Sequence, residues 1–402
     1  MVNIMAINNE LSRCLGCIKK PCMINCPLNN DIPEIIKLLK DNKNEEAYQL
    51  LSNTTCLGSI CGRVCPHMCM LNCTKGKIDN SINIGSIEMY LSDMFLDKDY
   101  DKKDSINKKV AIIGGGPTGL TCAYFLAREG IDVTIFEKHE KLGGLLEYGI
   151  PEYRLDRNIL KRNINKILKL GINVELNRNI DSLEELNEYD AIYIGMGANK
   201  SRMLNIKGED KYNVLGGNEL LEYGNYPDFK DKIVNIIGGG NVAIDVARTI
   251  KRMNAKEVNI IYRRSEKEMP ALSSEVEEAK LEGINIIYKT NIVEVLDKEI
   301  ELIKTDLIDK GEGRLSPINI EGSNYKIKND YVIKALGSLP LDIVKNYNLE
   351  LDNGFIKVNN YHTSKEGVFA GGEITNTGGT ISSAARDGRE AAKEIINYLK
   401  EG

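Results

Sequence analysis

Nine of the ten cysteines lie between Cys14 and Cys73, and their spacing is regular. Thiolate sulfur is the ligand that iron–sulfur clusters use, and a Cys-x2-Cys start followed by Cys-Pro is typical of ferredoxin-like segments. So dense an array therefore predicts one-electron transfer through bound clusters rather than ordinary core packing. The array comprises Cys14-x2-Cys17-x4-Cys22-x3-Cys26-Pro27, then Cys56, Cys61, Cys65-Pro66, Cys69 and Cys73.

A first glycine-rich turn follows the apolar run 110–113 and opens a helix expected over 120–129. Gly114 permits the tight turn, Gly116 lets the backbone approach a pyrophosphate, and Gly119 lets the helix pack closely on the strand. A second strand, 132–137, ends at Glu137, where a carboxylate can accept hydrogen bonds from ribose hydroxyls. A solvated strand end is the alternative interpretation of Glu137, and the full strand–turn–helix–strand context favours a dinucleotide site.

A second copy of this motif spans 233–243, with Gly238, Gly240 and Ala243 in the same three roles. Its following strand, 258–262, ends in Arg263-Arg264 instead of an acid. Guanidinium groups bind phosphate through charge and a fork of donors, so this site is predicted to bind NADP(H). Either arginine taken singly could also be a solvated side chain.

The C-terminal region contributes a third glycine turn. The segment 367–373 is expected to be a strand that ends in Gly371-Gly372-Glu373, and Gly378-Gly379-Thr380 precede a helix over 381–399. The positive end of that helix can stabilise the anionic reduced form of a flavin. A solvated C-terminal helix is the alternative.

The elements that must position these residues change in character along the chain. Residues 1 to about 100 are expected to form a small helical domain, with helices starting at Asp31 and Asn44 and a third over 86–96. A charged linker over 97–109 marks a domain boundary. From Val110 onward, short apolar strands alternate with helices, which predicts an α/β arrangement.

The composition limits the class of protein. A chain of 402 residues is expected to form two or three domains, and a net charge of −5 without a basic stripe gives no reason to expect nucleic-acid binding. No apolar stretch approaches the ~20 residues needed to span a bilayer, and the first five residues lack the features of a secretory signal. We therefore expect a cytoplasmic protein, where clustered cysteines favour metal over disulfides.

Together these motifs resemble one family of electron-input flavoproteins. It contains the small subunit of glutamate synthase, the N-terminal half of dihydropyrimidine dehydrogenase and that enzyme's separate bacterial electron-input subunit. It also includes the larger subunit of a bifurcating NADH-dependent ferredoxin:NADP oxidoreductase. The resemblance covers almost the whole chain and rests on Ser12–Cys17, Gly62–Pro66, Gly143–Pro151, Gly239–Arg248, and Tyr262–Ser265 leading to Glu268–Ala271.

The resemblance implies an α+β multidomain fold. A helical domain with two iron–sulfur clusters (1–100) would precede an FAD domain (106–205 and 337–402) that is interrupted by an NADP(H) domain (206–336), both of Rossmann-like three-layer type. One 4Fe-4S cluster would be held by Cys14, Cys17, Cys22 and Cys73. The second would be held by Cys26, Cys65, Cys69 and, in the position where relatives place Glu or Gln, Glu88. A solvated helix carboxylate is the alternative for Glu88, and Cys56 and Cys61 are left without a role.

The resemblance also implies the nucleotide sites. The expected FAD residues are Gly114, Gly116, Pro117, Gly119, Glu137, Lys138, Gly144, Leu145, Gly149, Pro151, Arg154, Gly197, Gly372, Glu373, Thr380 and Ile381. The expected NADP(H) residues are Gly238, Gly240, Asn241, Val242, Ala243, Arg263 and Arg264. Glu373 departs from the family, which normally has Asp after Gly-Gly to bond the flavin's ribityl chain.

The predicted reaction is NADPH oxidation, with hydride transfer to FAD and then single electrons through two 4Fe-4S clusters. No acid–base side chain is needed for hydride transfer, so no catalytic residue is assigned. The electrons would go to a catalytic partner subunit of glutamate synthase-like or dihydropyrimidine dehydrogenase-like type, in a hetero-oligomer without nucleic acid or membrane. The alternatives are a subunit of a bifurcating NAD(P)H:ferredoxin oxidoreductase and, in another class, a zinc-stapled interaction protein with a vestigial nucleotide fold.

Overall fold

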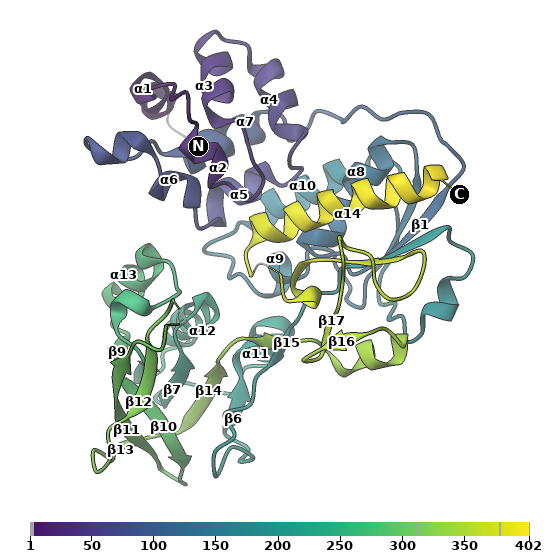
Figure 1. Cartoon of the computed structure of the whole chain (residues 1–402). Coiled ribbons are helices and arrows are strands. Elements are labelled where there is room, and N and C mark those ends of the chain that lie inside the picture. The colour runs from purple at the N-terminus through teal and green to yellow at the C-terminus, as the bar shows by residue number, and fades with distance from the viewer. Residues whose placement is uncertain (1–3, 312, 378, 402) are drawn as a thin grey trace. The chain divides into compact units, whose positions relative to one another are not determined.

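The computed structural model describes residues 4–311, 313–377 and 379–401 (Figure 1). Gly378, part of the third glycine turn, lies outside the described residues. The chain divides into two compact units. The first unit comprises residues 1–147, 152–197 and 342–402, and the second comprises residues 148–151 and 198–341.

The cysteine-rich segment of the first unit is helical, as expected. Asp31 caps α3 by accepting a hydrogen bond from the backbone N–H of Glu34, with Pro33 in the first turn, and Asn83 caps α7 in the same way. The apolar faces of α1, α3, α4 and α7 form one core. The helices are α1 (Ile4–Arg13), α2 (Pro21–Ile24), α3 (Ile32–Lys40), α4 (Asn44–Ser52), α5 (Gly58–Val64), α6 (Met68–Leu71), η1 (Thr74–Lys77) and α7 (Ile84–Met94).

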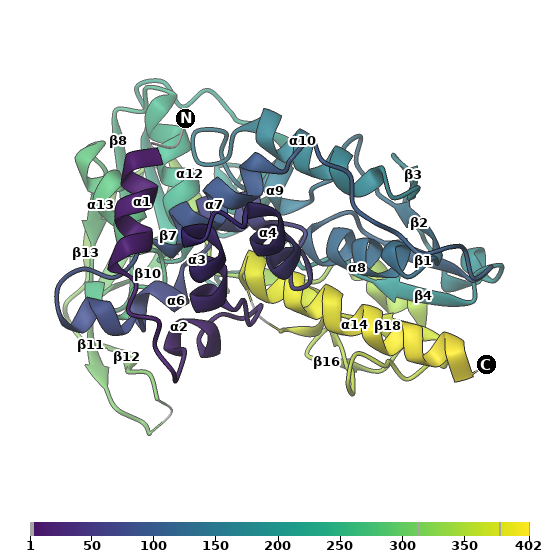
Figure 2. The same cartoon turned by 90° about the horizontal axis from the view of Figure 1, so that it is seen from above.

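The rest of the first unit is built on a parallel sheet of order β18-β4-β1-β2-β3. The strands are β1 (Lys109–Ile113), β2 (Asp132–Phe136), β3 (Asn173–Glu175), β4 (Ala191–Ile194) and β18 (Val368–Ala370). Four helices belong to this part: α8 (Pro117–Arg128), α9 (Leu145–Tyr148), α10 (Arg157–Leu168) and α14 (Ile381–Glu401). Figure 1 shows α14 running beside α8, and Figure 2 shows the same helices from above.

Short elements complete this part of the first unit. They are η2 (Leu183–Leu186), η4 (Asp342–Tyr347), β16 (Leu351–Asp352), β17 (Phe355–Ile356) and η5 (Gly372–Thr375). The strands β16 and β17 pair as an antiparallel hairpin, and Ile356 of β17 joins a core that also includes residues of β1 and β4.

The second unit has its own parallel sheet, of order β6-β14-β7-β8-β9, and a smaller antiparallel sheet beside it. The parallel strands are β6 (Val214–Gly216), β7 (Ile233–Gly238), β8 (Glu257–Ile261), β9 (Asn285–Ile287) and β14 (Tyr331–Ala335). The antiparallel strands are β10 (Thr290–Val295), β11 (Glu299–Ile308), β12 (Ser316–Asn319) and β13 (Tyr325–Lys328). The remaining elements are β5 (Lys200–Ser201), β15 (Ser338–Leu339), α11 (Gly217–Tyr223), α12 (Asn241–Arg252), η3 (Glu266–Glu268) and α13 (Ser273–Leu281).

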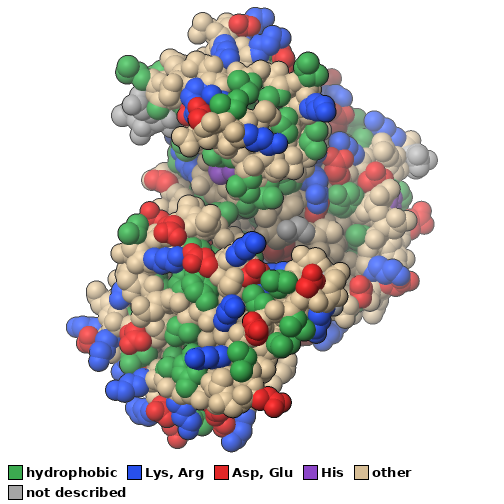
Figure 3. Space-filling model, turned by 60° about the vertical axis from the view of Figure 1, so that its left-hand side comes forward, with side chains coloured by type: hydrophobic (Ala, Val, Ile, Leu, Met, Phe, Trp, Pro, Cys, Tyr) green, Lys and Arg blue, Asp and Glu red, His purple; other side chains and the backbone are tan. Residues whose placement is uncertain are grey.

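Two parallel dinucleotide-type sheets after a helical segment confirm the predicted α+β fold class. The paired β5 and β15 lie where the chain enters and leaves the second unit. Among residues 4–311, 313–377 and 379–401, no helix has the length and apolar character needed to cross a membrane. On the face drawn in Figure 3, Lys and Arg side chains are interspersed with Asp and Glu.

A buried lysine marks the junction between the cysteine-rich helices and the first sheet's helices. Lys166, on α10, is 2% exposed, and its Nζ donates to the Tyr48 hydroxyl at 2.6 Å and the Phe95 carbonyl at 2.5 Å. It lies 4.4 Å from the ring centre of Tyr48 and 4.2 Å from that of Tyr100. Because Tyr48 and Phe95 come from the helical segment and Tyr100 from the charged linker, the lysine joins three parts of the unit.

Candidate iron–sulfur, flavin and nicotinamide sites

The four cysteines predicted for the first cluster line one cavity. Cys14 directly follows α1, Cys22 lies within α2, and Cys73 sits between α6 and η1. Burial, together with the neighbouring Cys73 and Cys14, raises the pKa of the Cys22 thiol to about 11. Crowded thiols of this kind need a cation to become thiolates together. The cavity is lined by Cys14, Cys17, Cys22 and Cys73 with Leu15, Pro21, Ile32, Pro33, Ile36, Thr74, Lys75, Ile82 and Ile84.

The residues predicted for the second cluster line another cavity in the same unit. Cys26 follows α2, Cys65 ends α5, and Cys69 lies in α6. Glu88, from α7, lines this cavity together with Cys61, which had no predicted role. The full lining is Cys26, Pro27, Leu28, Asn30, Ile32, Cys61, Cys65, His67, Met68, Cys69, Ile84, Glu88 and Ser382.

Glu88 is buried, with 8% of its surface exposed, and is oriented by two polar side chains. Asn30 Nδ2 donates to Glu88 Oε1 at 3.1 Å, and the Thr54 hydroxyl donates to Asn30 Oδ1 at 2.5 Å. Burial raises the pKa of Glu88 to about 8, although the Asn30 hydrogen bond lowers it. Among the described residues no Lys or Arg pairs with this carboxylate, whereas a bound metal ion would compensate its charge.

The donor groups that line each cavity are mainly cysteines. Within the described part of the chain, no three His, Cys, Asp or Glu side chains converge closely enough to bind one metal ion. Each protein ligand of a 4Fe-4S cluster binds a different iron, so its ligands lie farther apart than those of one tetrahedral zinc. Each cavity is lined by four cysteines, and thiolates are the ligands that a 4Fe-4S cluster uses, so the two linings fit the donor sets of two clusters.

Cys56 and Cys122 lie outside the residues that line the two cavities. Cys56 is buried, and its Sγ lies 3.8 Å from the Thr121 hydroxyl on α8. Cys122 is buried within α8. Cys56 therefore packs where the cysteine-rich segment meets α8.

The first glycine turn has the close approaches that make its glycines necessary. Gly114 has a φ of +101°, and a Cβ there would lie 2.7 Å from the Met196 backbone. A Cβ on Gly119 would lie 1.9 Å from the Gly114 carbonyl oxygen, so only glycine lets α8 pack on the turn. Gly144 faces Gly116, with its Cβ position 2.9 Å from the Gly116 Cα. This side-chain-free cradle at the start of α8 fits a pyrophosphate.

Glu137 follows β2 and is buried, with 4% exposure. One carboxylate oxygen accepts from the Gly115 N–H at 2.8 Å and the other from the His139 N–H at 2.9 Å. Each oxygen keeps a free lone pair. The side chain is thus held beside the glycine turn in a position from which it could accept a ribose hydroxyl.

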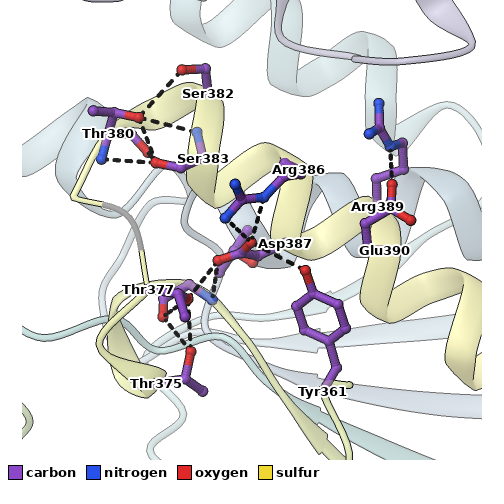
Figure 4. Close-up of polar contacts among 12 residues, drawn as sticks. Tyr361, Thr375, Thr377, Thr380, Ser382, Ser383, Arg386, Asp387, Arg389 and Glu390 are labelled. Atoms are coloured by element: carbon purple, nitrogen blue, oxygen red, sulfur yellow. Dashed lines mark hydrogen bonds and ion pairs between the residues drawn. The ribbon is translucent and has the colours of Figure 1, made fainter. Parts of the chain in front are cut away.

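A buried aspartate on α14 holds the third glycine turn (Figure 4). Asp387, 1% exposed, accepts from the Gly372 N–H at 3.3 Å and from the Thr377 hydroxyl at 2.7 Å. Arg386 and the Tyr361 hydroxyl donate to its other oxygen. Thr380 caps α14, since its Oγ1 accepts from the Ser383 N–H at 3.1 Å. Gly372, Glu373, Thr380 and Ile381 are therefore brought together at one end of α14.

The remaining predicted flavin residues are distributed as follows. Burial raises the pKa of the Glu373 carboxyl, the residue that departs from the family pattern. Gly197 has a φ of +70° and ends the stretch of the first unit that begins at Glu152. Lys138, Leu145 and Arg154 lie in the first unit, with Pro117 at the start of α8. Gly149 and Pro151 belong to the second unit.

The second glycine turn lies in the second unit, between β7 and α12. Gly238 has a φ of +148°, and a Cβ there would lie 2.1 Å from the Ala335 carbonyl oxygen. Gly240 precedes α12, whose first residues are Asn241, Val242 and Ala243. Asn241 Oδ1 accepts from the Leu272 N–H at 3.0 Å, which ties the loop after η3 to the turn.

Three arginines gather after β8. Arg264 Nε donates to the Leu315 carbonyl at 2.8 Å, and Arg314 donates to the Tyr262 hydroxyl at 2.8 Å. Burial lowers the pKa of Arg263, and the neighbouring Arg264 and Arg314 lower it further. The Tyr262 ring would lie 2.4 Å from a Cβ on Gly239, so this cationic group adjoins the glycine turn. Such unneutralised positive charge fits an anion such as a 2′-phosphate.

Sequence reasoning missed four residues of these sites: Cys61, Ser382, Asp387 and Arg314. Arg314 reaches the site from the β11–β12 connection, some 50 residues after Arg264, and no local motif marks it. Ser382 and Asp387 lie in α14, and the groups that their side chains contact depend on how that helix packs against distant segments. Cys61 was visible as an unassigned cysteine, but its cavity depends on how α5 packs on α7.

Comparison with known proteins matches the cysteine-rich segment and the rest of the chain to two different family models. The family model for dihydropyrimidine dehydrogenase domain II, 4Fe-4S cluster, matches residues 2–100. The model for pyridine nucleotide-disulphide oxidoreductases matches residues 108–388. The glutamate synthase [NADPH] small chain of Halomonas elongata is 33% identical over 425 residues, which cover 97% of this chain and 90% of that one. The chain belongs to the family of the glutamate synthase small chains.

Other relatives in this family carry further sequence. The beta subunit of the NADP(+)-dependent formate dehydrogenase of Moorella thermoacetica is 33% identical over 428 residues, and the chain spans only 60% of its length. In fold, FprA from Mycobacterium tuberculosis in complex with NADPH matches with a TM-score of 0.67 at 18% identity, over 73% of this chain and 85% of that one. Membership identifies the chain as an NADPH-dependent flavin and iron–sulfur oxidoreductase, as the sequence predicts.

Proposed function

We propose that the protein is the NADPH-oxidising electron-input subunit of a larger enzyme, with FAD, two 4Fe-4S clusters and a separate catalytic partner. When bound, FAD accepts a hydride from NADPH and releases electrons singly, and the clusters carry one electron at a time. The observation that carries the proposal is that the flavin-type glycine cradle and both cysteine-lined cavities belong to one compact unit.

The chain's own residues would bind and orient these groups. The first glycine turn and Glu137 would hold the pyrophosphate and ribose of FAD, and Asp387 would keep the Gly372 turn in place beneath it. Cys14, Cys17, Cys22 and Cys73 would ligate one cluster, and Cys26, Cys65, Cys69 and Glu88 the other. Arg263, Arg264 and Arg314 would bind the 2′-phosphate that distinguishes NADPH from NADH.

An exposed apolar surface near the first cluster site supports transfer to a partner protein. Ile18, next to Cys17, is 98% exposed, and Leu71, two residues before Cys73, is 74% exposed. Leu15, which lines the cavity, is half exposed. Large exposed apolar side chains are typical of protein contact sites. We propose a partner of glutamate synthase-like or dihydropyrimidine dehydrogenase-like type, since several relatives are named as subunits.

Anaerobic purification from the native cell tests the proposal. An electron-input subunit should copurify with a larger catalytic subunit, and NADPH should reduce the flavin of the isolated chain without that partner. If NADPH reduces the flavin but no other subunit copurifies, the input reaction stands and the proposed partner subunit is contradicted. Failure of NADPH to reduce it would refute the assigned input reaction.

A further inference from the structure

The helix α14 contacts the second cluster cavity directly. Ser382, in its first turn, lines that cavity, and the Ser382 Oγ lies 3.5 Å from the Cys65 Sγ. Ser382 is buried, with 2% exposure. Seven residues later, Arg389 donates to the Leu28 carbonyl at 2.8 Å and the Thr54 carbonyl at 3.1 Å. Leu28 and Thr54 belong to segments that hold Cys26 and position Asn30 against Glu88.

The two contacts lie on one face of the helix, because residues seven apart are two turns apart. Figure 4 shows Ser382 and Arg389 projecting from one side, while Asp387 points toward Thr377 and Tyr361. One rigid helix therefore carries the second cluster cavity on one face and the Gly372 turn of the flavin site on another.

The direction of the Ser382 contact depends on the state of Cys65. A free thiol can donate its proton, whereas a thiolate that binds iron can only accept a hydrogen bond. With a cluster in the cavity, a hydrogen bond between these two groups requires the Ser382 hydroxyl as the donor, and Thr380 Oγ1, 3.3 Å from Ser382 Oγ, is then left to act as a donor to Ser382. A donor aimed at a ligand sulfur stabilises the extra negative charge of a reduced cluster and so raises its reduction potential.

We propose that Ser382 is a positioning and tuning residue that donates a hydrogen bond to the Cys65 thiolate and raises the reduction potential of the second cluster. This inference rests on the proposed function, since it requires a cluster in that cavity. The second cluster would then be easier to reduce than the same cluster without the Ser382 hydroxyl, and its cavity is lined by the helix that also supports the Gly372 turn.

The test compares two substitutions at position 382 whose side chains have nearly equal shape. Ser382→Thr keeps the hydroxyl and Ser382→Val replaces it with a methyl group, so the pair differs only in the donor. Redox titration of the anaerobically purified holoprotein, followed by electron paramagnetic resonance, should give the Val variant a more negative midpoint for the second cluster. A tenfold weaker reduction equilibrium, the upper end expected for one neutral hydrogen bond, corresponds to 59 mV for one electron.

Two internal controls complete the experiment. The first cluster of the same molecules should keep its midpoint, and Ser383→Ala should leave the second cluster unchanged because the Ser383 hydroxyl bonds to Thr380 instead. Equal midpoints for the Thr and Val variants, or equal shifts in both clusters, would overturn the assignment. Loss of the second cluster in both variants with the iron of the first retained would also overturn it, since the hydroxyl would then play no part. Complete absence of iron from the unmodified protein would refute the proposed function instead.

Discussion

The buried Lys166 offers a test of how the cysteine-rich helices are joined to the flavin-binding part of the first unit. Burial lowers the pKa of Lys166 to about 8 from its usual 10.5. A pKa difference of about 2.5 corresponds to about 3 kcal/mol, at 1.36 kcal/mol for each pKa unit. This is an upper bound, because two aromatic faces and two hydrogen-bond acceptors stabilise the ammonium form.

The sign of the effect on stability follows from proton binding. Below pH 8 the lysine is charged in both folded and unfolded chains, so the full penalty of burying it is present. Between about pH 8 and 10.5 the folded protein loses this proton first, and the unfolded chain then binds more protons. Stability from this group therefore rises with pH across that window.

The assay compares thermal unfolding of the wild-type holoprotein with Lys166→Met, which keeps a long apolar stem without the charge. The difference between the two Tm values at each pH cancels the contribution of the other groups that titrate in the same range. Between about pH 7 and about pH 10, the free energy of unfolding of the wild type should rise relative to that of the variant by up to ~3 kcal/mol, which corresponds to several degrees in Tm. A difference in Tm that does not vary with pH would refute the pKa assigned to this lysine.

Three further predictions concern the sites themselves. Glu88→Ala should loosen the second cluster while the first cluster and the flavin remain, and adding Cys61→Ser should remove the second cluster completely if Cys61 substitutes as a ligand. Iron analysis and electron paramagnetic resonance would detect both effects. Unaltered spectra of the Glu88→Ala variant would assign the ligand elsewhere. Changing Arg263 and Arg264 together to uncharged residues should cost a few kcal/mol of NADPH binding free energy, at ~1.5–3 kcal/mol for each charge-assisted hydrogen bond. The KM for NADPH should rise accordingly, and the KM for NADH should stay nearly unchanged. Asp387→Asn should weaken FAD retention about 10- to 100-fold, since a charged acceptor of the Gly372 turn is lost; equal FAD content after gel filtration would contradict this.

Much of the arrangement can be predicted from local sequence, because its determinants are local. A strand that runs into Gly114 and Gly116 and then a helix has few alternatives, and the structure has that unit between β1 and α8. The same holds for the second turn at Gly238. The helices expected at Asp31 and Asn44 begin within one residue of those positions.

The contacts between distant segments could not be predicted from one sequence. Ser382 meets Cys65 across 317 positions, and Arg389 meets Leu28 across 361. Such pairs depend on how α14 packs against the cysteine-rich helices, and no short-range pattern encodes that packing. The position of Arg314 beside Tyr262 and the position of Cys61 in the second cavity likewise depend on packing between segments that are distant in the sequence. The helix over 84–94 was expected over 86–96, because Asn83 was not identified as its cap.

The most direct test of the central claim is the metal and flavin content of the chain purified without oxygen. The two cavities and the glycine cradle predict about eight irons, in two clusters of four, and one FAD per chain. NADPH should then bleach the flavin absorbance and reduce the clusters. Iron near four per chain, or zinc in stoichiometric amount, would contradict the assignment of two clusters on which the electron path depends.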